Sequence, residues 1–192
     1  MGLNKWYEKG ITPEKYMGDL EKHKESFSYV YDNIDLTTFE KDEEFFQFVK
    51  EKNLRAIALA EVWCGHCMLN VPILLRLAEK TNMSVRLLPR DENLELMDQY
   101  LTNGKSRSIP IFIFIDESGK EVAKWGPITE TVKQFVDKHK VNLPAKEAEN
   151  YDEKFTEFIN LVSESLRENG DFWRASYEDI KQALLDIDAV EK

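Results

Sequence analysis

The chain contains only two cysteines, Cys64 and Cys67, and both lie where a short apolar run meets the start of a helical pattern. Residues 55–61 form the apolar run, which predicts a buried strand. From Cys67 onward, apolar residues recur at helical spacing as far as Asn82, so we expect a helix to begin at the cysteines. A buried strand that leads directly into a helix favours an α/β fold, in which the two pack together.

The other apolar patterns extend this strand–helix unit into an α/β core. Residues 116–119 form a turn signal between two further strands, which indicates an antiparallel hairpin. Helices linking the earlier strands imply parallel pairing there, so the sheet should be mixed. Together the patterns predict helices over residues 12–34, 42–52, 67–82, 94–101 and 132–139, and strands over residues 55–61, 85–88, 111–115 and 120–125.

The first of these helices is amphipathic and begins at Thr12 and Pro13. Its apolar residues alternate at spacings of four and three over a length that is short for an independent coiled coil. We therefore expect this helix to pack on its own domain or on the C-terminal helices. A dimer seam is the alternative, and we expect a monomer rather than a homodimer.

The C-terminal segment is predicted to be helical and acidic. Residues 141–148 form a linker, and an apolar helical stripe follows over residues 155–166 until Gly170 breaks it. Ser176 can cap a last helix. Residues 146–192 carry 13 acidic and 6 basic side chains, which is typical of the solvated outer face of amphipathic helices.

The charge of the chain excludes some classes of partner. The sequence has 36 acidic and 26 basic side chains, a net charge of −10, which argues against nucleic-acid binding because that draws on lysine and arginine. The first 20 residues contain no apolar stretch suited to a signal peptide. The longest apolar run, residues 109–115, is too short to cross a bilayer. We therefore expect a cytoplasmic protein without a membrane partner.

The spacing of the cysteines has three interpretations. A structural disulfide is disfavoured, because the cytosol keeps thiols reduced and so short a loop adds little stability. A structural zinc site needs two more ligands, and the three histidines lack the paired spacing of such sites. A redox-active dithiol is favoured. We expect no metal and no bound cofactor.

The predicted helix start assigns different roles to the two thiols. Cys64 meets unpaired N–H groups and the positive end of the helix dipole, which favour a thiolate, so it is the predicted nucleophile. Cys67 lies almost one turn later and is shielded, so it is the predicted resolving thiol. Gly65 leaves room for a substrate and lets the turn tighten.

Around these cysteines the sequence resembles the thioredoxin fold, over about residues 36–141, more than half of the chain. Trp63 precedes the cysteines and Pro72 follows Cys67 by five residues, as in thioredoxins. The segment from Arg107 to Pro110 resembles the family's cis-proline loop, which faces the cysteines. Gly126 resembles the glycine that lets the backbone close against the active site. The resemblance implies a three-layer sandwich with a central mixed sheet, here with N- and C-terminal helical extensions.

In the family, the cis-proline exposes the backbone of the residue before it. Ile109 would then pair with an extended substrate. The alternative for Pro110 is a simple strand-start proline. Trp63 is either a lid over the thiolate and a substrate contact or a packing residue. Arg107 either supports the thiolate and substrate or is solvated in its loop.

Two departures from the family affect the mechanism. The buried aspartate and lysine of thioredoxins fall on Ala58 and Leu87, so the usual proton acceptor for Cys67 is missing. Glu61 is a candidate replacement acting through water, although a solvent-facing carboxylate at the strand end is the simpler interpretation. His66 is the other candidate.

The pair Gly65–His66 resembles that of protein disulfide isomerases rather than the Gly-Pro of thioredoxins. A partly charged imidazole beside Cys64 would stabilise the thiolate and make the couple more oxidising. The compartment still sets the direction, so reduction or isomerisation of disulfides is favoured over net oxidation.

We therefore predict a thiol–disulfide oxidoreductase that acts on protein or small-thiol disulfides. No dinucleotide fingerprint occurs, so a separate reductase or a low-molecular-weight thiol should recycle the Cys64–Cys67 disulfide. The alternative is a thioredoxin-like interaction or redox-sensing module without turnover. We divide the chain into a helical extension at residues 1–35, a thioredoxin-like domain at 36–143 and an acidic helical extension at 144–192 that packs on the core.

Overall fold

The computed structural model describes residues 2–21, 23–35 and 42–187. The predicted start of the central domain, residue 36, lies outside the described residues. The fold is organised around a four-stranded sheet in the order β2-β1-β3-β4. Its strands are β1 (Arg55–Ala60), β2 (Ser84–Pro89), β3 (Ile111–Ile115) and β4 (Glu121–Trp125).

The pairing of the strands confirms the predicted mixed sheet. Strands β1 and β2 are parallel, because a helix connects them, whereas β3 is antiparallel to both β1 and β4. The predicted hairpin is thus β3–β4. Strand β3 and all of β1 after Arg55 are buried, since helices and loops cover both faces of the sheet.

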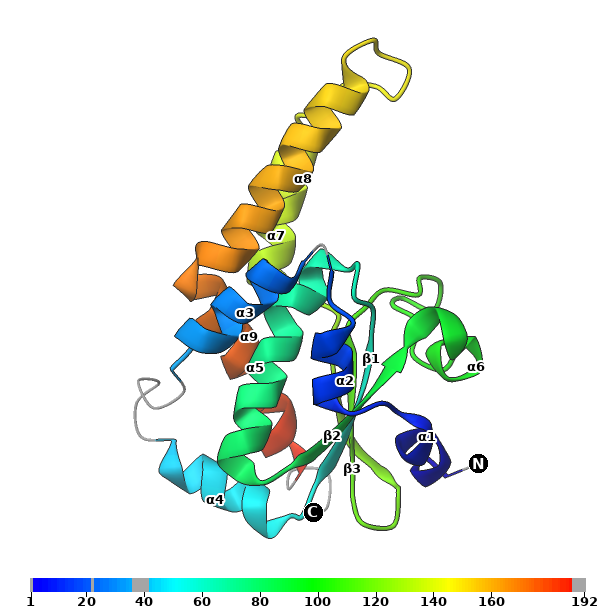
Figure 1. Ribbon diagram of the computed structural model, residues 1–192, viewed down its shortest axis with the longest axis vertical. Helices are drawn as coiled ribbons and strands as arrows, with labels where there is room; N and C mark the ends of the chain where they lie inside the picture. Colours follow the sequence, from blue (N-terminus) through cyan, green and yellow to red (C-terminus); the bar gives the residue numbers. More distant parts are fainter. Residues whose placement is uncertain (1, 22, 36–41, 188–192) are drawn as a thin grey trace.

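Helices form layers on the two sides of the sheet (Figure 1). One side carries α5 and α9, which pack on each other and on the strands, and α3, α4 and α8 pack around α5. The other side carries α1 and α6, and α2 packs at β2. The bounds are α1 (Asn4–Lys9), α2 (Pro13–Gly18), α3 (Lys24–Asn33), α4 (Glu43–Glu51), α5 (Gly65–Thr81), α6 (Leu94–Met97), α8 (Tyr151–Glu168) and α9 (Gly170–Leu185).

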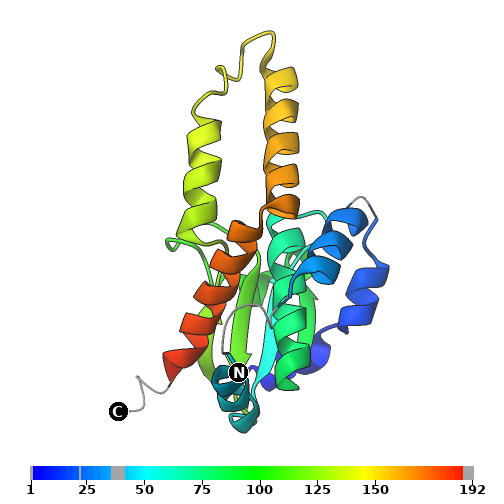
Figure 2. The ribbon, with the colours of Figure 1, turned by 90° about the vertical axis from the view of Figure 1, so that its left-hand side faces the viewer.

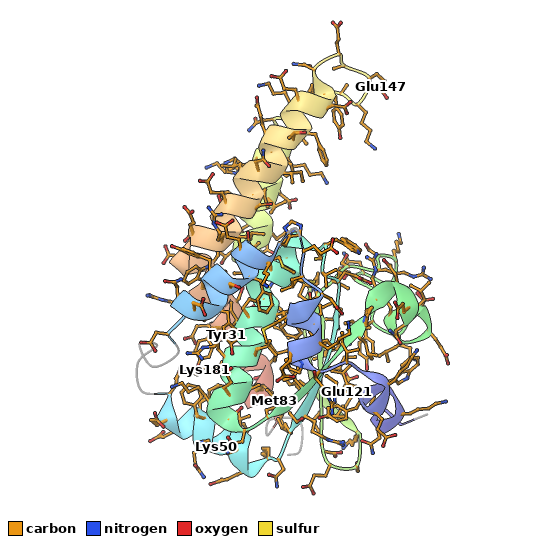
Figure 3. The ribbon with its side chains drawn as sticks, viewed as in Figure 1. Tyr31, Lys50, Met83, Glu121, Glu147 and Lys181 are labelled. Atoms are coloured by element: carbon orange, nitrogen blue, oxygen red, sulfur yellow. The ribbon has the colours of Figure 1, made fainter. Side chains whose placement is uncertain are left out.

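Helices α7 (Glu130–Lys140) and α8 form an arm that projects from the body of the molecule. The two helices run side by side, and the chain reverses direction at the far end (Figure 2). Glu147 lies at this tip (Figure 3). The C-terminal half of α8 returns to the core, where Val162 and Leu166 are buried.

Several predicted helices differ from those observed. The single helix expected from Thr12 to residue 34 is wrong, because α2 ends at Gly18, a poor helix former, and α3 begins only at Lys24. Helix α1 was not predicted. The helix expected over residues 94–101 is limited to the short α6, because a tight turn follows, bridged between Thr102 and Ser106.

The start of the last helix is also corrected. The predicted cap, Ser176, is fully buried in the middle of α9. The side chain of Asn169 instead accepts the Asp171 N–H at 2.9 Å, and Gly170 is the first residue of α9 rather than a break in a longer stripe.

The predicted packing of the N-terminal segment within the chain is confirmed, since α3 contacts α5 and α8. Helix α4 matches the prediction for residues 42–52, and α5 ends at Thr81, followed by the C-cap Asn82 in left-handed backbone. Within the described ranges, none of the helices combines the length and apolar character that crossing a lipid bilayer requires.

Candidate active site

The junction between β1 and α5 places both cysteines at the first turn of a helix. Cys64 is the N-cap of α5, with extended backbone, and its sulfur accepts the Cys67 N–H at 3.4 Å. The two thiols are free. Cys64 is 7% exposed, whereas Cys67 is completely buried. The predicted helix start at the cysteines is thus confirmed, with Cys64 as the more accessible thiol.

The surroundings shift the pKa values of the two thiols in opposite directions. The pKa of Cys64 is lowered, chiefly by a hydrogen bond from the Cys67 thiol, then by the N–H groups of Cys67 and His66 and the charge of Arg90. The pKa of Cys67 is raised well above its ordinary value, first by burial and then by the neighbouring Cys64. Cys64 is therefore the thiol that ionises first.

The predicted proline loop faces these thiols. The Ile109–Pro110 peptide bond is cis, and the Cys64 thiol donates to the carbonyl of Ile109 at 3.7 Å. Gly126 has a φ of +122°, and a Cβ there would lie 2.2 Å from the Pro110 oxygen. Only glycine fits this position, so the expected close approach of backbone is confirmed. A second cis bond, Gly126–Pro127, was not predicted.

Trp63 lies at the surface beside the thiols, with 53% of its side chain exposed, so it is not a packing residue of the core. The guanidinium of Arg90 lies over its ring, 4.9 Å from the ring centre. Arg90 also donates to the carbonyl of Arg107 at 3.0 Å and pairs with Asp91. Arg90 therefore links Trp63 to the proline loop.

Arg107 itself is turned to a different partner. Its guanidinium donates to both carboxylate oxygens of Asp98, at 2.6 and 2.9 Å. The carbonyl of Arg107, and not its guanidinium, is linked to Trp63, because Arg90 donates to that carbonyl and lies over the Trp63 ring. The expectation that Arg107 binds substrate stays a prediction.

Two expectations for the residues between the cysteines are corrected. The turn does not need Gly65 for its geometry, because a Cβ there would meet open space and its φ is not positive. Burial lowers the pKa of His66, and its Nε2 has no hydrogen-bond partner among the described residues. His66 is therefore neutral at pH 7, and the cation that acts on Cys64 is Arg90.

Glu61 is buried rather than facing solvent, with 8% of its surface exposed. Its carboxylate accepts the Asp91 N–H at 2.8 Å, yet burial raises its pKa above the ordinary value. Its charge also raises the pKa of Cys67, so the carboxylate lies within electrostatic reach of that thiol. A buried carboxyl group with a raised pKa beside a thiol pair is a candidate functional group.

Comparison with known proteins identifies the family. A family model described as "Thioredoxin" matches residues 10–141, more than half of the chain. The chain belongs to the thioredoxin family. The match begins within the segment that we predicted as the N-terminal extension. No curated protein matches the sequence.

Two solved structures resemble this thioredoxin-family chain over its whole length, and a third resembles half of it. A Pseudomonas aeruginosa protein of unknown function is 13% identical, with a TM-score of 0.66, covering 100% of this chain and 99% of its own. An HIV epitope scaffold is 13% identical, with a TM-score of 0.63 and 99% of both chains covered. Fasciola hepatica thioredoxin is 25% identical over 50% of this chain and 89% of its own, with a TM-score of 0.33. The first two show that the extended fold occurs elsewhere.

Within the thioredoxin family, this chain has an apolar pair below the cysteines. Ala58 and Leu87 are partners in the β1–β2 ladder, and both are completely buried. Neither side chain can accept a proton from Cys67. The charged groups that act on the Cys67 thiol, Cys64 and Glu61, come from the β1–α5 junction instead.

Sequence reasoning missed two residues of this thioredoxin-type site, Arg90 and Tyr16. The parallel register pairs Ala60 with Pro89, so the residues that follow both strands meet at one edge of the sheet. That rule was available from the sequence and points to Arg90. Nothing local could have identified Tyr16, whose hydroxyl donates to the Glu61 carbonyl at 3.1 Å from α2.

In the part of the chain that the structure describes, no three histidine, cysteine or acidic side chains gather as metal ligands would.

Proposed function

We propose that the protein is a thiol–disulfide oxidoreductase that exchanges disulfides with protein or small-thiol substrates. The observation that carries the proposal is the asymmetry of the two thiols opposite the Ile109 carbonyl. Cys64 has a lowered pKa and some exposure, whereas Cys67 is buried with a raised pKa. A nucleophile and a shielded resolving thiol differ in this way.

The reaction has two exchange steps. The Cys64 thiolate attacks one sulfur of the client disulfide, so that a mixed disulfide forms and the other client sulfur leaves as a thiolate. Cys67 then loses its proton and attacks the Cys64 sulfur, which releases the second client thiolate. Two electrons pass to the client, and a Cys64–Cys67 disulfide remains.

The loop opposite the thiols would position the client chain. Ile109 comes just before the cis-proline, and its carbonyl faces Cys64. An extended client segment that hydrogen-bonds to this backbone would bring its disulfide to the Cys64 sulfur. The exposed face of Trp63 would contact the client. Gly126 would support the proline loop, because its missing side chain lets its backbone lie against Pro110.

Glu61 is the proposed proton acceptor for Cys67. A base works best when its pKa approaches the working pH, and burial shifts the pKa of Glu61 upward in that direction. The acceptor is needed because burial disfavours a thiolate on Cys67. Water would carry the proton between the two groups.

Recycling of the disulfide would require an external donor of electrons. A separate reductase or a low-molecular-weight thiol would reduce the Cys64–Cys67 disulfide, since the chain has no dinucleotide-binding fingerprint. In a reducing compartment the net direction is reduction or isomerisation of client disulfides.

The test is to trap the mixed disulfide. Cys67→Ser should accumulate covalent complexes with clients through Cys64 under disulfide stress, because the resolving thiol is gone. The complexes should disappear on reduction, and Cys64→Ser should form none. If no complexes accumulate, and if a variant without both cysteines keeps partner binding and cellular function, the protein is an interaction or sensing module instead.

A further inference from the structure

Tyr16 belongs to α2 in the N-terminal segment, yet its hydroxyl reaches the turn that carries the redox thiols. The side chain is 2% exposed, and its hydroxyl donates to the Glu61 carbonyl at 3.1 Å. The same carbonyl accepts the Cys64 N–H at 3.2 Å. One buried hydroxyl thus holds the main chain between β1 and α5 from outside both elements.

The main chain that Tyr16 holds is in contact with the resolving thiol. The backbone N–H of Glu61 lowers the pKa of the Cys67 thiol, against the larger effect of burial, which raises it. A small movement of Glu61 would therefore change the stability of a thiolate on Cys67. The neighbouring β1–β2 pair cannot stabilise this thiolate in place of Glu61, because Ala58 and Leu87 are apolar.

The hydroxyl of Tyr16 can serve only as a donor. Burial first, and then the negative charges of Cys67, Cys64 and Glu61, raise the pKa of Tyr16 far above its ordinary value. The phenol stays protonated wherever thiol exchange proceeds. It therefore cannot take the proton of Cys67, but it can fix the groups that do.

The charged and titratable groups around this point come from α5, from the end of β1 and from the segment after β2. The α5 start contributes Cys64, and the β1 end contributes Glu61, whose own neighbours are the three charged residues after β2. These neighbours are Arg90, Asp91 and Glu92. Removing the Tyr16 hydroxyl leaves all of these charges in place, so its effect can be separated from theirs.

We propose that Tyr16 is a positioning residue for the resolving step, holding the Glu61 main chain so that a thiolate can form on the buried Cys67. The N-terminal segment is then a working part of the redox site. This inference rests on the proposed function for its biological meaning, but the chemistry of the two thiols can be measured without a natural client.

The experiment uses the full chain and the aromatic disulfide dithiobis-nitrobenzoate. Cys64 attacks the reagent and releases one coloured thiolate, and a mixed disulfide remains on Cys64. Cys67 then attacks the Cys64 sulfur, so the Cys64–Cys67 disulfide forms and the second coloured thiolate leaves. The two releases report separately on the nucleophile and on the resolving thiol.

Tyr16→Phe should slow the second release about five- to tenfold at neutral pH, the effect of losing one buried hydrogen bond. The pH dependence of the second release should shift to higher pH, because a thiolate on Cys67 becomes harder to form, while that of the first release should not change. Tyr177→Phe is the matched control. Tyr177 is also fully buried, and its hydroxyl donates to Asp42 at 2.6 Å, in contact with α4 rather than with the thiols. It should leave both releases unchanged.

The inference is overturned if Tyr16→Phe releases the second thiolate as fast as Tyr177→Phe, or if it shifts both releases equally. If Tyr16→Phe does not fold, a fluorinated tyrosine at position 16 keeps the shape and strengthens the donor, and it should speed the second release. An unchanged rate there would also reject the inference. The proposed function fails separately, if the wild-type protein shows both releases but reduces no protein disulfide.

Discussion

The molecule buries one carboxylate at the start of α4, which packs near the far end of α5, and one beside the thiols at the start of α5, and the two have opposite surroundings. At the end near α4, Asp42 is 7% exposed and accepts hydrogen bonds from the Tyr177 hydroxyl and the Lys181 ammonium. At the thiol end, Glu61 is 8% exposed and accepts the Asp91 N–H. Burial still raises the pKa of Glu61 above its ordinary value.

This difference indicates that Asp42 has a structural role and that Glu61 is available for chemistry. We call Asp42, Tyr177 and Lys181 the Asp42 cluster. Its contacts join the start of α4 to α9. In Figure 3, Lys181 lies in the body of the molecule, far from the tip of the arm. A carboxylate matched by a cation and a hydroxyl holds elements together. A carboxylate whose charged form is disfavoured by burial reduces stability and is available to take a proton.

The largest expected effect is the loss of the Asp42 cluster. Asp42→Ala should lower the free energy of unfolding by about 3–5 kcal/mol, because it leaves the Lys181 ammonium partly buried without its carboxylate. Chemical denaturation measures this loss. The folded fraction should keep both steps of thiol exchange at wild-type rates.

Asp98→Ala is the control for this prediction. Asp98 pairs with Arg107 at the surface, so its removal should cost far less stability than that of Asp42. Equal losses in the two variants would contradict the contrast between the ends of α5. So would a change in the thiol chemistry of Asp42→Ala.

The parts of the fold and of the site that depend on a local sequence pattern could be predicted from the sequence. The strand before the cysteines, the helix after them, the β3–β4 hairpin and the proline loop each depend on a continuous pattern of residues. Gly126 could be assigned only through the family resemblance, since its clash with Pro110 arises between distant segments. The apolar stripe from Tyr16 to Ile34 predicted one helix where the structure has two, because α2 ends at Gly18 and packs at β2, whereas α3 packs on α5 and α8.

The electrostatics of the site were beyond the sequence. The motif favoured His66 as the cation beside Cys64, but burial makes the imidazole neutral and Arg90 takes that place. Glu61 was expected to face solvent because it ends a strand, whereas the segment after β2 covers it. In each case the environment came from a contact between segments that are distant in the sequence.

A second prediction concerns Glu61, the buried carboxylate beside the thiols. Glu61→Gln should slow the resolving step about 100-fold, the contribution of a general base, while the first attack by Cys64 changes little. In the wild type, this step should accelerate as pH rises through the pKa of Glu61, and the variant should lose that dependence. Rapid-mixing measurements across pH follow both steps.

The same variant should have the opposite effect on stability from Asp42→Ala. The folded state binds the Glu61 proton more tightly than the unfolded state, so stability falls as pH rises from the ordinary pKa of 4.5 through the raised one. Glu61→Gln removes this loss and should be at least as stable as wild type at pH 7. Glu92→Gln removes an exposed charge that is the smallest of the influences on the pKa of Glu61, so it should change both properties far less; if it matches Glu61→Gln, the base is not Glu61.

The smallest expected effect compares two cations of equal exposure. The side chains of Arg90 and Lys181 are both 20% exposed, but Arg90 acts on the Cys64 thiol while Lys181 acts on Asp42. Arg90→Gln should raise the pKa of Cys64 and slow its alkylation below that pKa about two- to threefold, as expected for a partly exposed charge. Its stability should stay close to that of wild type.

Two variants test whether this effect is specific to Arg90. Arg107→Gln removes an equal charge from the adjacent loop, but its partner is Asp98, so the pH profile of Cys64 alkylation should not move. Lys181→Gln should lower stability and leave alkylation unchanged. If Arg107→Gln shifts the alkylation profile as far as Arg90→Gln, the thiolate responds to the total charge of the loops. The division between a chemical and a structural end of α5 would then depend on the carboxylates alone.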